Sequence, residues 1–185
     1  ISERSPEMST IDPERSAMGQ GTNNYTNVQL SRYVAALANR GTVFELSLLD
    51  KETDSDGNLI GEYTPVAISH INIQEAYWDA VAQGMRDVIQ EGSASRLFKD
   101  LPIEVAGKTG TAQESKTRGN HAFFISYGPY TNPEICVTVN IPYGYSSSNA
   151  AEVAKNVYRL YYGYTSVEEI MDSKALDVSN ITIGD

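Results

Sequence analysis

Residues 106–113 read Ala106-Gly107-Lys108-Thr109-Gly110-Thr111-Ala112-Gln113, and most of them lie in the first of three strand-like runs. The runs are expected at 103–111, 122–128 and 135–142. The third alternates aliphatic with smaller or polar residues, the period of two that is typical of a strand with one apolar face. A short, turn-rich link at 128–133 predicts that the second and third strands are antiparallel neighbours.

Two helices are expected before these strands. Thr26 followed by Gln29 forms a capping box, and Gly41 is placed to end the first helix in a left-handed conformation. A second helix is predicted from the cap signature of Asn72 and Glu75. It is followed by a short helical turn at Arg96-Leu97-Phe98.

A last helix is expected after the strands. Ser148 or Asn149 is predicted to cap it, Gly163 is predicted to end it, and it should cover one face of the sheet. A further short helix is expected from Ser166. Together these patterns predict an α+β fold in which helices pack on an antiparallel sheet.

Two strands joined by a tight reversal are expected between residues 43 and 66. The reversal is Asp54-Ser55-Asp56-Gly57-Asn58, in which Asp-Gly and Gly-Asn are typical turn residues. Asp54, Asp56 and Asn58 also resemble calcium ligands, but the spacing is wrong. Leu59 stands where a calcium loop needs glycine, and Pro65 stands where it needs a bidentate glutamate.

Composition limits the partners of the chain. It has 185 residues, 41% of them hydrophobic, with a net charge of −10 and no long apolar run. An acidic surface repels nucleic acid and anionic membranes, so neither is expected as a partner. The single Cys136 is expected to be a small buried hydrophobe in a strand. No metal or cofactor is expected.

Lys108-Thr109-Gly110 is one of three motifs that together build a serine acyl-transfer site, the others being Ser-x-x-Lys and Ser-x-Asn. No lysine has a serine three positions before it, and no Ser-x-Asn precedes Lys108. Ser147-Ser148-Asn149 does spell Ser-x-Asn, but it follows the strands and is better used to cap a helix. The chain therefore carries the substrate-binding wall of such a site without its nucleophile.

Two histidines are candidates for a proton acceptor. His121 opens a strand, and neither a serine elbow nor an ordered Asp accompanies it, so it is not expected to be a triad base. Asn120 and His121 are instead expected to border the groove. His70 is expected to be solvated in a connecting segment.

The order of several short segments indicates a family. Six segments follow one another along the chain: Ala17-Met18-Gly19-Gln20-Gly21, Val28-Gln29-Leu30, residues 35–41, residues 84–88, the Lys-Thr-Gly segment and His121-Ala122-Phe123-Phe124. This order resembles the C-terminal part of the transpeptidase domain of class B penicillin-binding proteins, from about Ala17 to about Tyr162. The resemblance implies a peptidoglycan D,D-transpeptidase, of whose five-stranded sheet this chain holds three strands.

The resemblance also implies roles for four residues. Lys108 would supply positive charge near the terminal carboxylate of the substrate, and Thr109 and Thr111 would donate hydroxyl hydrogen bonds to it. Gly110 would let the substrate lie against the strand as an added edge. The backbone amide of Thr111 would be one half of the oxyanion hole. Lys108 and Thr111 are thus the expected catalytic residues, and Lys108, Thr109, Gly110 and Thr111 the expected substrate-binding residues.

The family further implies the partners and location of the parent protein. Its ligands would be stem peptides ending in D-Ala-D-Ala and β-lactams, bound with the remainder of the transpeptidase domain and within a cell-wall synthesis complex. The location would be the extracytoplasmic face of the bacterial cytoplasmic membrane. Residues 1–164 would form the domain portion and 165–185 an acidic tail.

Three functional interpretations remain open at this point. The first is a piece of a D,D-transpeptidase that is inactive alone because it lacks the serine. The second is a D,D-carboxypeptidase or a serine β-lactamase with the same motifs. The third is a non-catalytic module that binds or senses β-lactams.

Overall fold

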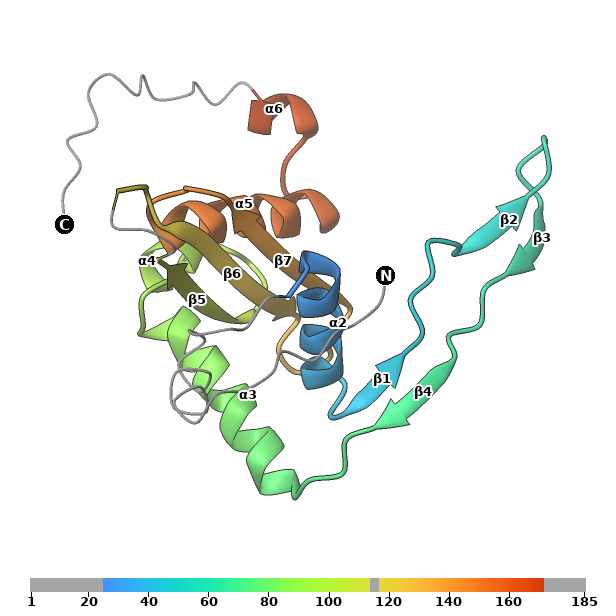
Figure 1. Cartoon of the computed structure of the whole chain (residues 1–185). Coiled ribbons are helices and arrows are strands. Elements are labelled where there is room, and N and C mark those ends of the chain that lie inside the picture. The colour runs from blue at the N-terminus through green and yellow to red at the C-terminus, as the bar shows by residue number, and fades with distance from the viewer. Residues whose placement is uncertain (1–24, 114–116, 172–185) are drawn as a thin grey trace.

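The computed structural model describes residues 25–113 and 117–171. Its centre is a three-stranded antiparallel sheet in the order β5-β6-β7, formed by Ala106–Ala112, His121–Gly128 and Ile135–Ile141. All three predicted strands are confirmed, although β5 begins three residues later than expected. Figure 1 shows helices on both faces of this sheet.

One face of the sheet is covered by α5 (Ser147–Tyr161), as predicted, and also by the short helix α4 (Ser95–Phe98). The core on this face includes Phe98 stacked on Phe124, with ring centroids 5.5 Å apart. The Tyr158 hydroxyl donates to Ser126 Oγ at 2.9 Å, and Ser126 Oγ lies 3.3 Å from the Val137 carbonyl oxygen. Because both hydroxyls are buried, these bonds remove a desolvation cost of about 1–3 kcal/mol per group.

The cap predicted for α5 is wrong by two or three residues. Ser146 is the N-cap, and its hydroxyl accepts from the Ser148 amide at 3.2 Å. Asn149 instead donates its side-chain amide to the Gly144 carbonyl at 2.8 Å. Ser146 has the extended backbone of an N-cap residue, so the first helical residue is Ser147. Gly163 follows the helix with a φ of 71°, as its predicted end requires.

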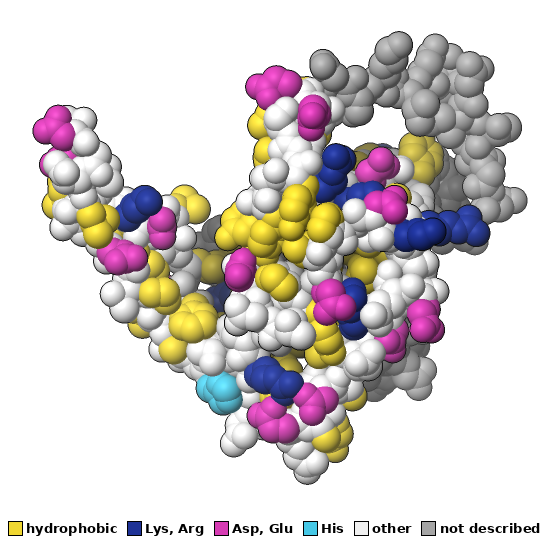
Figure 2. Space-filling model, turned by 180° about the vertical axis from the view of Figure 1, so that it is seen from behind, with side chains coloured by type: hydrophobic (Ala, Val, Ile, Leu, Met, Phe, Trp, Pro, Cys, Tyr) yellow, Lys and Arg dark blue, Asp and Glu magenta, His cyan; other side chains and the backbone are white. Residues whose placement is uncertain are grey.

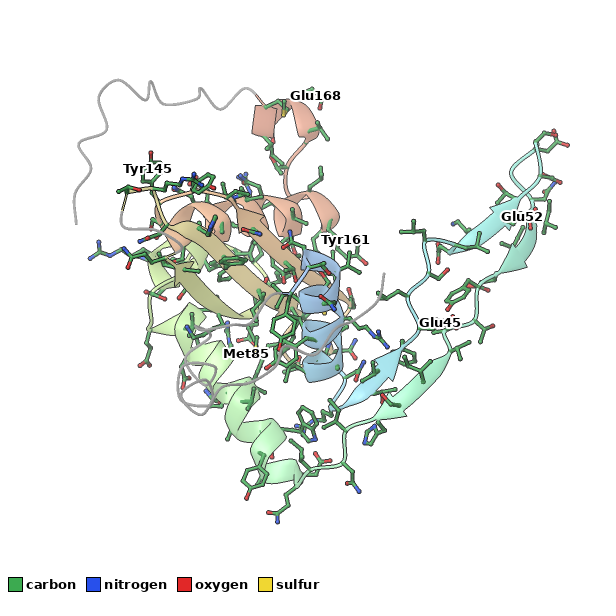
Figure 3. The ribbon with its side chains drawn as sticks, in the orientation of Figure 1. Glu45, Glu52, Met85, Tyr145, Tyr161 and Glu168 are labelled. Atoms are coloured by element: carbon green, nitrogen blue, oxygen red, sulfur yellow. The ribbon has the colours of Figure 1, made fainter. Side chains whose placement is uncertain are left out.

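The other face is covered by α2 (Asn27–Ala38) and by α3 (Glu75–Gln90) as far as Met85, whereas Val88 and Ile89 near the end of α3 join the core on the α5 face. The core on the α2 face joins Val34 of α2 and Met85 of α3 to Ala106 and Tyr127 of the sheet. Figure 3 labels Met85 among these elements. Most of the buried side chains in this layer are apolar, so burial is what holds the two helices to the sheet.

The capping box of α2 is confirmed. The backbone amide of Gln29 donates to Thr26 Oγ1 at 3.2 Å, and the backbone amide of Thr26 donates to the side-chain oxygen Oε1 of Gln29 at 2.8 Å. Beyond the helix, Arg40 and Gly41 both have positive φ angles, of 61° and 108°. Gly41 thus has the predicted left-handed backbone, and Arg40 shares it.

The cap predicted for α3 from Asn72 is wrong. The N-cap is Gln74, which makes no side-chain capping bond. The chain is still extended at Gln74, so the first helical residue is Glu75. The Glu75 carboxylate pairs with Arg40 Nη1 at 2.6 Å rather than reaching back along its own helix.

Residues 42–70 form a projecting arm (Figure 1). At its base, β1 (Thr42–Phe44) pairs with β4 (Ala67–His70), and at its tip β2 (Lys51–Thr53) pairs with β3 (Leu59–Glu62). The predicted reversal is confirmed, because Asp54 Oδ1 accepts from the amides of Asp56 and Asn58 at 2.9 and 2.8 Å.

The expectation for His70 needs correction. It is exposed, but it is the last residue of β4 and not part of a connector. Its Nδ1 lies 3.3 Å from Thr42 Oγ1, across the antiparallel pair. Strand pairing at the base of the arm, which no local pattern revealed, places it there.

After α5 the chain forms α6 (Val167–Met171). The Glu169 amide donates to Ser166 Oγ at 3.2 Å, which confirms Ser166 as the start of a short helix. The segments expected at residues 1–21 and the end of the acidic tail lie outside the described residues. No helix in the described part of the chain is long and apolar enough to cross a membrane.

Candidate active site

The Lys-Thr-Gly residues lie on β5, at an edge of the sheet. Among the described strands, β5 pairs only with β6, with Lys108 opposite Ile125 and Gly110 opposite Phe123. Helix α3 packs against β5. The outer side of β5 therefore presents backbone N–H and C=O groups to which an extended ligand could add as a further strand.

Alternation along β5 divides the four site residues between two faces. Ala106 packs in the core beneath α2 and α3. Lys108 and Gly110 lie two and four residues further along the strand, so their side-chain positions belong to the same face. A side chain at Gly107 would meet Phe124, so Thr109 and Thr111 belong to the α5 face. The lysine and the two threonines thus start from opposite faces, and they can meet a common ligand only around the free edge.

Lys108 is exposed and its ammonium is held close to its own strand. Nζ donates to the carbonyl oxygen of Thr109 at 2.7 Å. This is its only hydrogen bond within the described residues, so two of its three N–H groups are available to an anion. A charge-assisted hydrogen bond to a carboxylate is about twice as strong as a neutral one.

The hydroxyl of Thr109 has a partner that sequence reasoning missed. Ser93 Oγ lies 2.9 Å from Thr109 Oγ1. Ser93 stands between Gly92, where a Cβ would come within 2.8 Å of Val88 Cα, and Ala94, which is almost fully buried. The turn after α3 is therefore tightly packed, and it places the Ser93 hydroxyl next to the Thr109 hydroxyl.

Local sequence carries little signal for this pairing. The Gly-Ser-Ala-Ser run after α3 indicated only a break in the helical pattern. Ser93 and Thr109 are 16 residues apart, and only the packing of α3 against β5 brings them together.

A second cluster lies beyond the C-terminal end of β5. His121 pairs with Ala112 across the ladder, and its Nδ1 accepts from the Tyr143 amide at 3.2 Å. The His121 and Tyr143 rings lie 4.9 Å apart, and Arg118 Nη1 donates to the Tyr143 hydroxyl at 3.0 Å. Because Nδ1 accepts, a neutral His121 carries its proton on Nε2.

Cys136 of β7 lies on the face covered by α2, half-buried. Burial raises the pKa of its thiol to about 11. At neutral pH almost none of it is thiolate, the form that attacks electrophiles, which agrees with its predicted role as a small hydrophobe.

The Ser-x-Asn sequence at Ser147-Ser148-Asn149 lies in a helix and not in β5. Ser147, Ser148 and Asn149 form the first turn of α5, which covers the face of the sheet opposite to Lys108. This location agrees with its rejection as the missing motif.

Both the sequence and the fold are similar to those of known proteins. The chain matches the family described as "Penicillin binding protein transpeptidase domain" over residues 3–159. It is 32% identical over 163 residues to the peptidoglycan D,D-transpeptidase MrdA of Haemophilus influenzae, covering 78% of this chain and 25% of that protein. It is 30% identical over 162 residues to penicillin-binding protein 2B of Streptococcus pneumoniae strain D39, covering 80% of this chain and 24% of that protein.

Solved structures agree with these similarities. Penicillin-binding protein 2B of S. pneumoniae strain R6 superposes with a TM-score of 0.73 at 24% identity, over 88% of this chain and 29% of that one. Pseudomonas aeruginosa PBP2 in complex with WCK 5153 superposes with a TM-score of 0.62 at 29% identity, over 83% and 37%. The chain spans about a quarter of the length of the curated relatives it matches.

Proposed function

The chain belongs to the penicillin-binding protein transpeptidase domain family, and we propose that it is the substrate- and penicillin-binding part of a serine D,D-transpeptidase that cross-links peptidoglycan stem peptides. The observation that carries this proposal is the placement of Lys108-Thr109-Gly110 on an edge strand. That edge supports the addition of an extended peptide.

Four residues would grip the ligand. Lys108, with two N–H groups available, would bind the terminal carboxylate of a D-Ala-D-Ala peptide or of a β-lactam. Thr109 and Thr111 would donate hydroxyl hydrogen bonds from the other face of the strand. Gly110 would leave room for the ligand backbone, and the Thr111 amide would stabilise the oxyanion. β-Lactam complexes of structural neighbours from Mycobacterium tuberculosis, which share the fold, are consistent with this ligand class.

The nucleophile would come from outside this chain. Acyl transfer needs a serine activated by a neighbouring base, and no Ser-x-x-Lys occurs in the 185 residues. We therefore propose that the chain alone is inactive and works with the remainder of a transpeptidase domain. Residues 1–164 would form the domain portion and 165–185 a tail, on the extracytoplasmic face of the membrane and within a cell-wall synthesis complex.

Two measurements test the proposal. The chain alone, incubated with benzylpenicillin, should show no covalent adduct in its intact mass. In a longer protein that supplies the Ser-x-x-Lys segment, Lys108→Ala should slow acylation by a fluorescent penicillin about thirty- to a thousandfold, or roughly 2–4 kcal/mol.

The control for that variant is Lys99→Ala, because Lys99 is also an exposed lysine but follows α4 and is not part of β5. It should acylate at the wild-type rate. A penicillin adduct on any serine of the isolated chain would contradict the proposed inactivity. A wild-type acylation rate for Lys108→Ala, at unchanged melting temperature, would contradict the role given to β5.

A further inference from the structure

The arm of residues 42–70 stands away from the body of the protein (Figure 1). Within the described residues it is anchored at its base, where the Ile71 amide donates to the Gly41 carbonyl at 2.8 Å and β1 packs against α2. A Cβ on Gly41 would lie 2.6 Å from the Ile71 carbonyl oxygen and 2.9 Å from the Trp78 ring. The base is therefore tightly packed, whereas in the outer half β2 and β3 pack mainly against each other among the described helices and strands.

The outer half of the arm exposes aliphatic side chains. Leu48 is completely exposed, and four others expose more than half of their surface: Leu46, Leu49, Leu59 and Ile60. Isolated aliphatic side chains are normal on a surface, but here they gather on one narrow element. A two-stranded ribbon is only marginally stable by itself in water. The arm thus has apolar surface to bury and no described neighbour to bury it.

The arm is also strongly acidic. It has a net charge of −5, half of the −10 of the whole chain, because Lys51 is its one cation against six carboxylates: Glu45, Asp50, Glu52, Asp54, Asp56 and Glu62. Within the described residues none of these carboxylates is in an ion pair. Figure 2 shows acidic and hydrophobic side chains along the arm, and Figure 3 labels Glu45 and Glu52 on it.

The strands of the arm have unpaired outer edges, since each described pair, β1-β4 and β2-β3, is a sheet of two. Both pairs are interrupted by irregularities, between Val43 and Phe44 and between Glu52 and Thr53. Short, interrupted strands with like charges disfavour pairing between two identical edges. Two copies of the arm, each with a net charge of −5, would also repel each other.

We propose that the arm is a docking surface for a partner protein segment that is both apolar and basic. Its aliphatic side chains would cover the exposed leucines and isoleucine, and its lysines or arginines would lie opposite the carboxylates that form no ion pair within the described residues. Anionic lipid and nucleic acid are excluded by the same charge that selects a basic segment. The partner is thus defined by charge complementarity and by the apolar side chains between the charges.

The test uses the whole 185-residue chain and a short fluorescein-labelled peptide of alternating lysine and isoleucine. Fluorescence anisotropy is measured at about 150 mM salt, where charges further apart than about 8 Å are largely screened. Two companion peptides replace isoleucine with serine or lysine with glutamate. Both should bind at least about tenfold more weakly than the lysine–isoleucine peptide.

Three variants locate the site. Leu48→Ser with Leu49→Ser removes apolar surface, and Glu45→Gln with Glu52→Gln and Glu62→Gln removes charge. Each should weaken binding by at least about tenfold. The control, Glu91→Gln with Asp100→Asn and Glu152→Gln, removes as many charges from exposed positions of the body and should change the affinity by less than about twofold. Circular dichroism confirms that each variant is folded.

Several results would overturn the proposal. One is an equal loss of affinity in the body variant, which would mean that the peptide responds to total charge. Another is equal binding of the serine peptide, and a third is absence of binding by the lysine–isoleucine peptide. Light scattering that shows a dimer of the chain, dissociated by Leu48→Ser with Leu49→Ser, would identify a second copy as the occupant instead.

Discussion

Two glycines of the same strand should respond very differently to alanine. Gly107 and Gly110 both lie on β5, three residues apart, and neither has a positive φ angle. Their side-chain positions point to opposite faces of the sheet. Replacing each by alanine adds the same methyl group, so any difference in stability reports the space on each face.

The structure gives the size of the difference. A Cβ on Gly107 would lie 2.7 Å from Phe124 Cζ, 3.0 Å from the Ile125 carbonyl oxygen and 3.1 Å from Ser126 Cβ. Because Phe124 and Ser126 are fully buried, they cannot move aside cheaply, and overpacking should cost about 2–3 kcal/mol. A Cβ on Gly110 would meet only Phe123 Cβ, at 3.3 Å.

Gly110→Ala should therefore cost less than about 1 kcal/mol. The mild contact is offset in part because alanine has less conformational freedom than glycine in the unfolded chain. The two variants should differ in free energy of unfolding by about 2 kcal/mol, with a melting temperature roughly 4–8 °C lower for Gly107→Ala.

Urea unfolding of the whole chain measures this difference. Trp78 is the only tryptophan and is buried, so its fluorescence reports unfolding, and circular dichroism provides a second probe. Equal destabilisation by the two variants, or a larger loss for Gly110→Ala, would refute the assignment of the two faces. In a longer, active protein, Gly110→Ala should in addition slow acylation although the fold survives.

Three further predictions concern other parts of the sheet. Tyr158→Phe should lower the free energy of unfolding by about 1–2 kcal/mol, measured in urea, because it removes the buried hydrogen bond to Ser126. The pKa of the Cys136 thiol is raised from 9.0 to about 11 in the folded protein, so its contribution to stability should be present below pH 9 and lost as pH rises toward 11. A Cys136→Ala variant should lack that part of the pH dependence, and equal pH profiles would contradict it. In a longer, active protein, Ser93→Ala should slow acylation about three- to tenfold and Ser93→Thr should restore it, because the hydroxyl holds Thr109. If Ser93→Ala has the same effect in a Thr109→Val background, the two residues are not coupled.

Much of the fold could be predicted from the sequence because the relevant signals are local. Thr26 and Gln29 lie three residues apart, and their capping box forms within one turn of α2. The alternation in β7 and the turn at Asp54 are likewise readable from a few neighbouring residues. The two predicted helix caps that were wrong, at Asn72 and at Ser148 or Asn149, involved competing polar residues within a short stretch, between which composition does not choose.

The candidate site was also predicted from the sequence alone. Lys108-Thr109-Gly110 is a contiguous motif on a predicted strand, and the order of the flanking segments resembled one family. The match over residues 3–159 confirms that family. The roles of Lys108, Thr109, Gly110 and Thr111 remain predictions.

Only the tertiary structure decided what surrounds that motif. The contact of Ser93 with Thr109 spans 16 residues, and the link between Arg40 and Glu75 spans 35, so each depends on how separate elements pack. The faces on which Lys108 and Thr109 lie, and the exposure of the arm, depend on which helices cover which side of the sheet. A sequence pattern fixes the period of an element, but a side chain acquires its neighbours only when burial of apolar surface brings distant elements together.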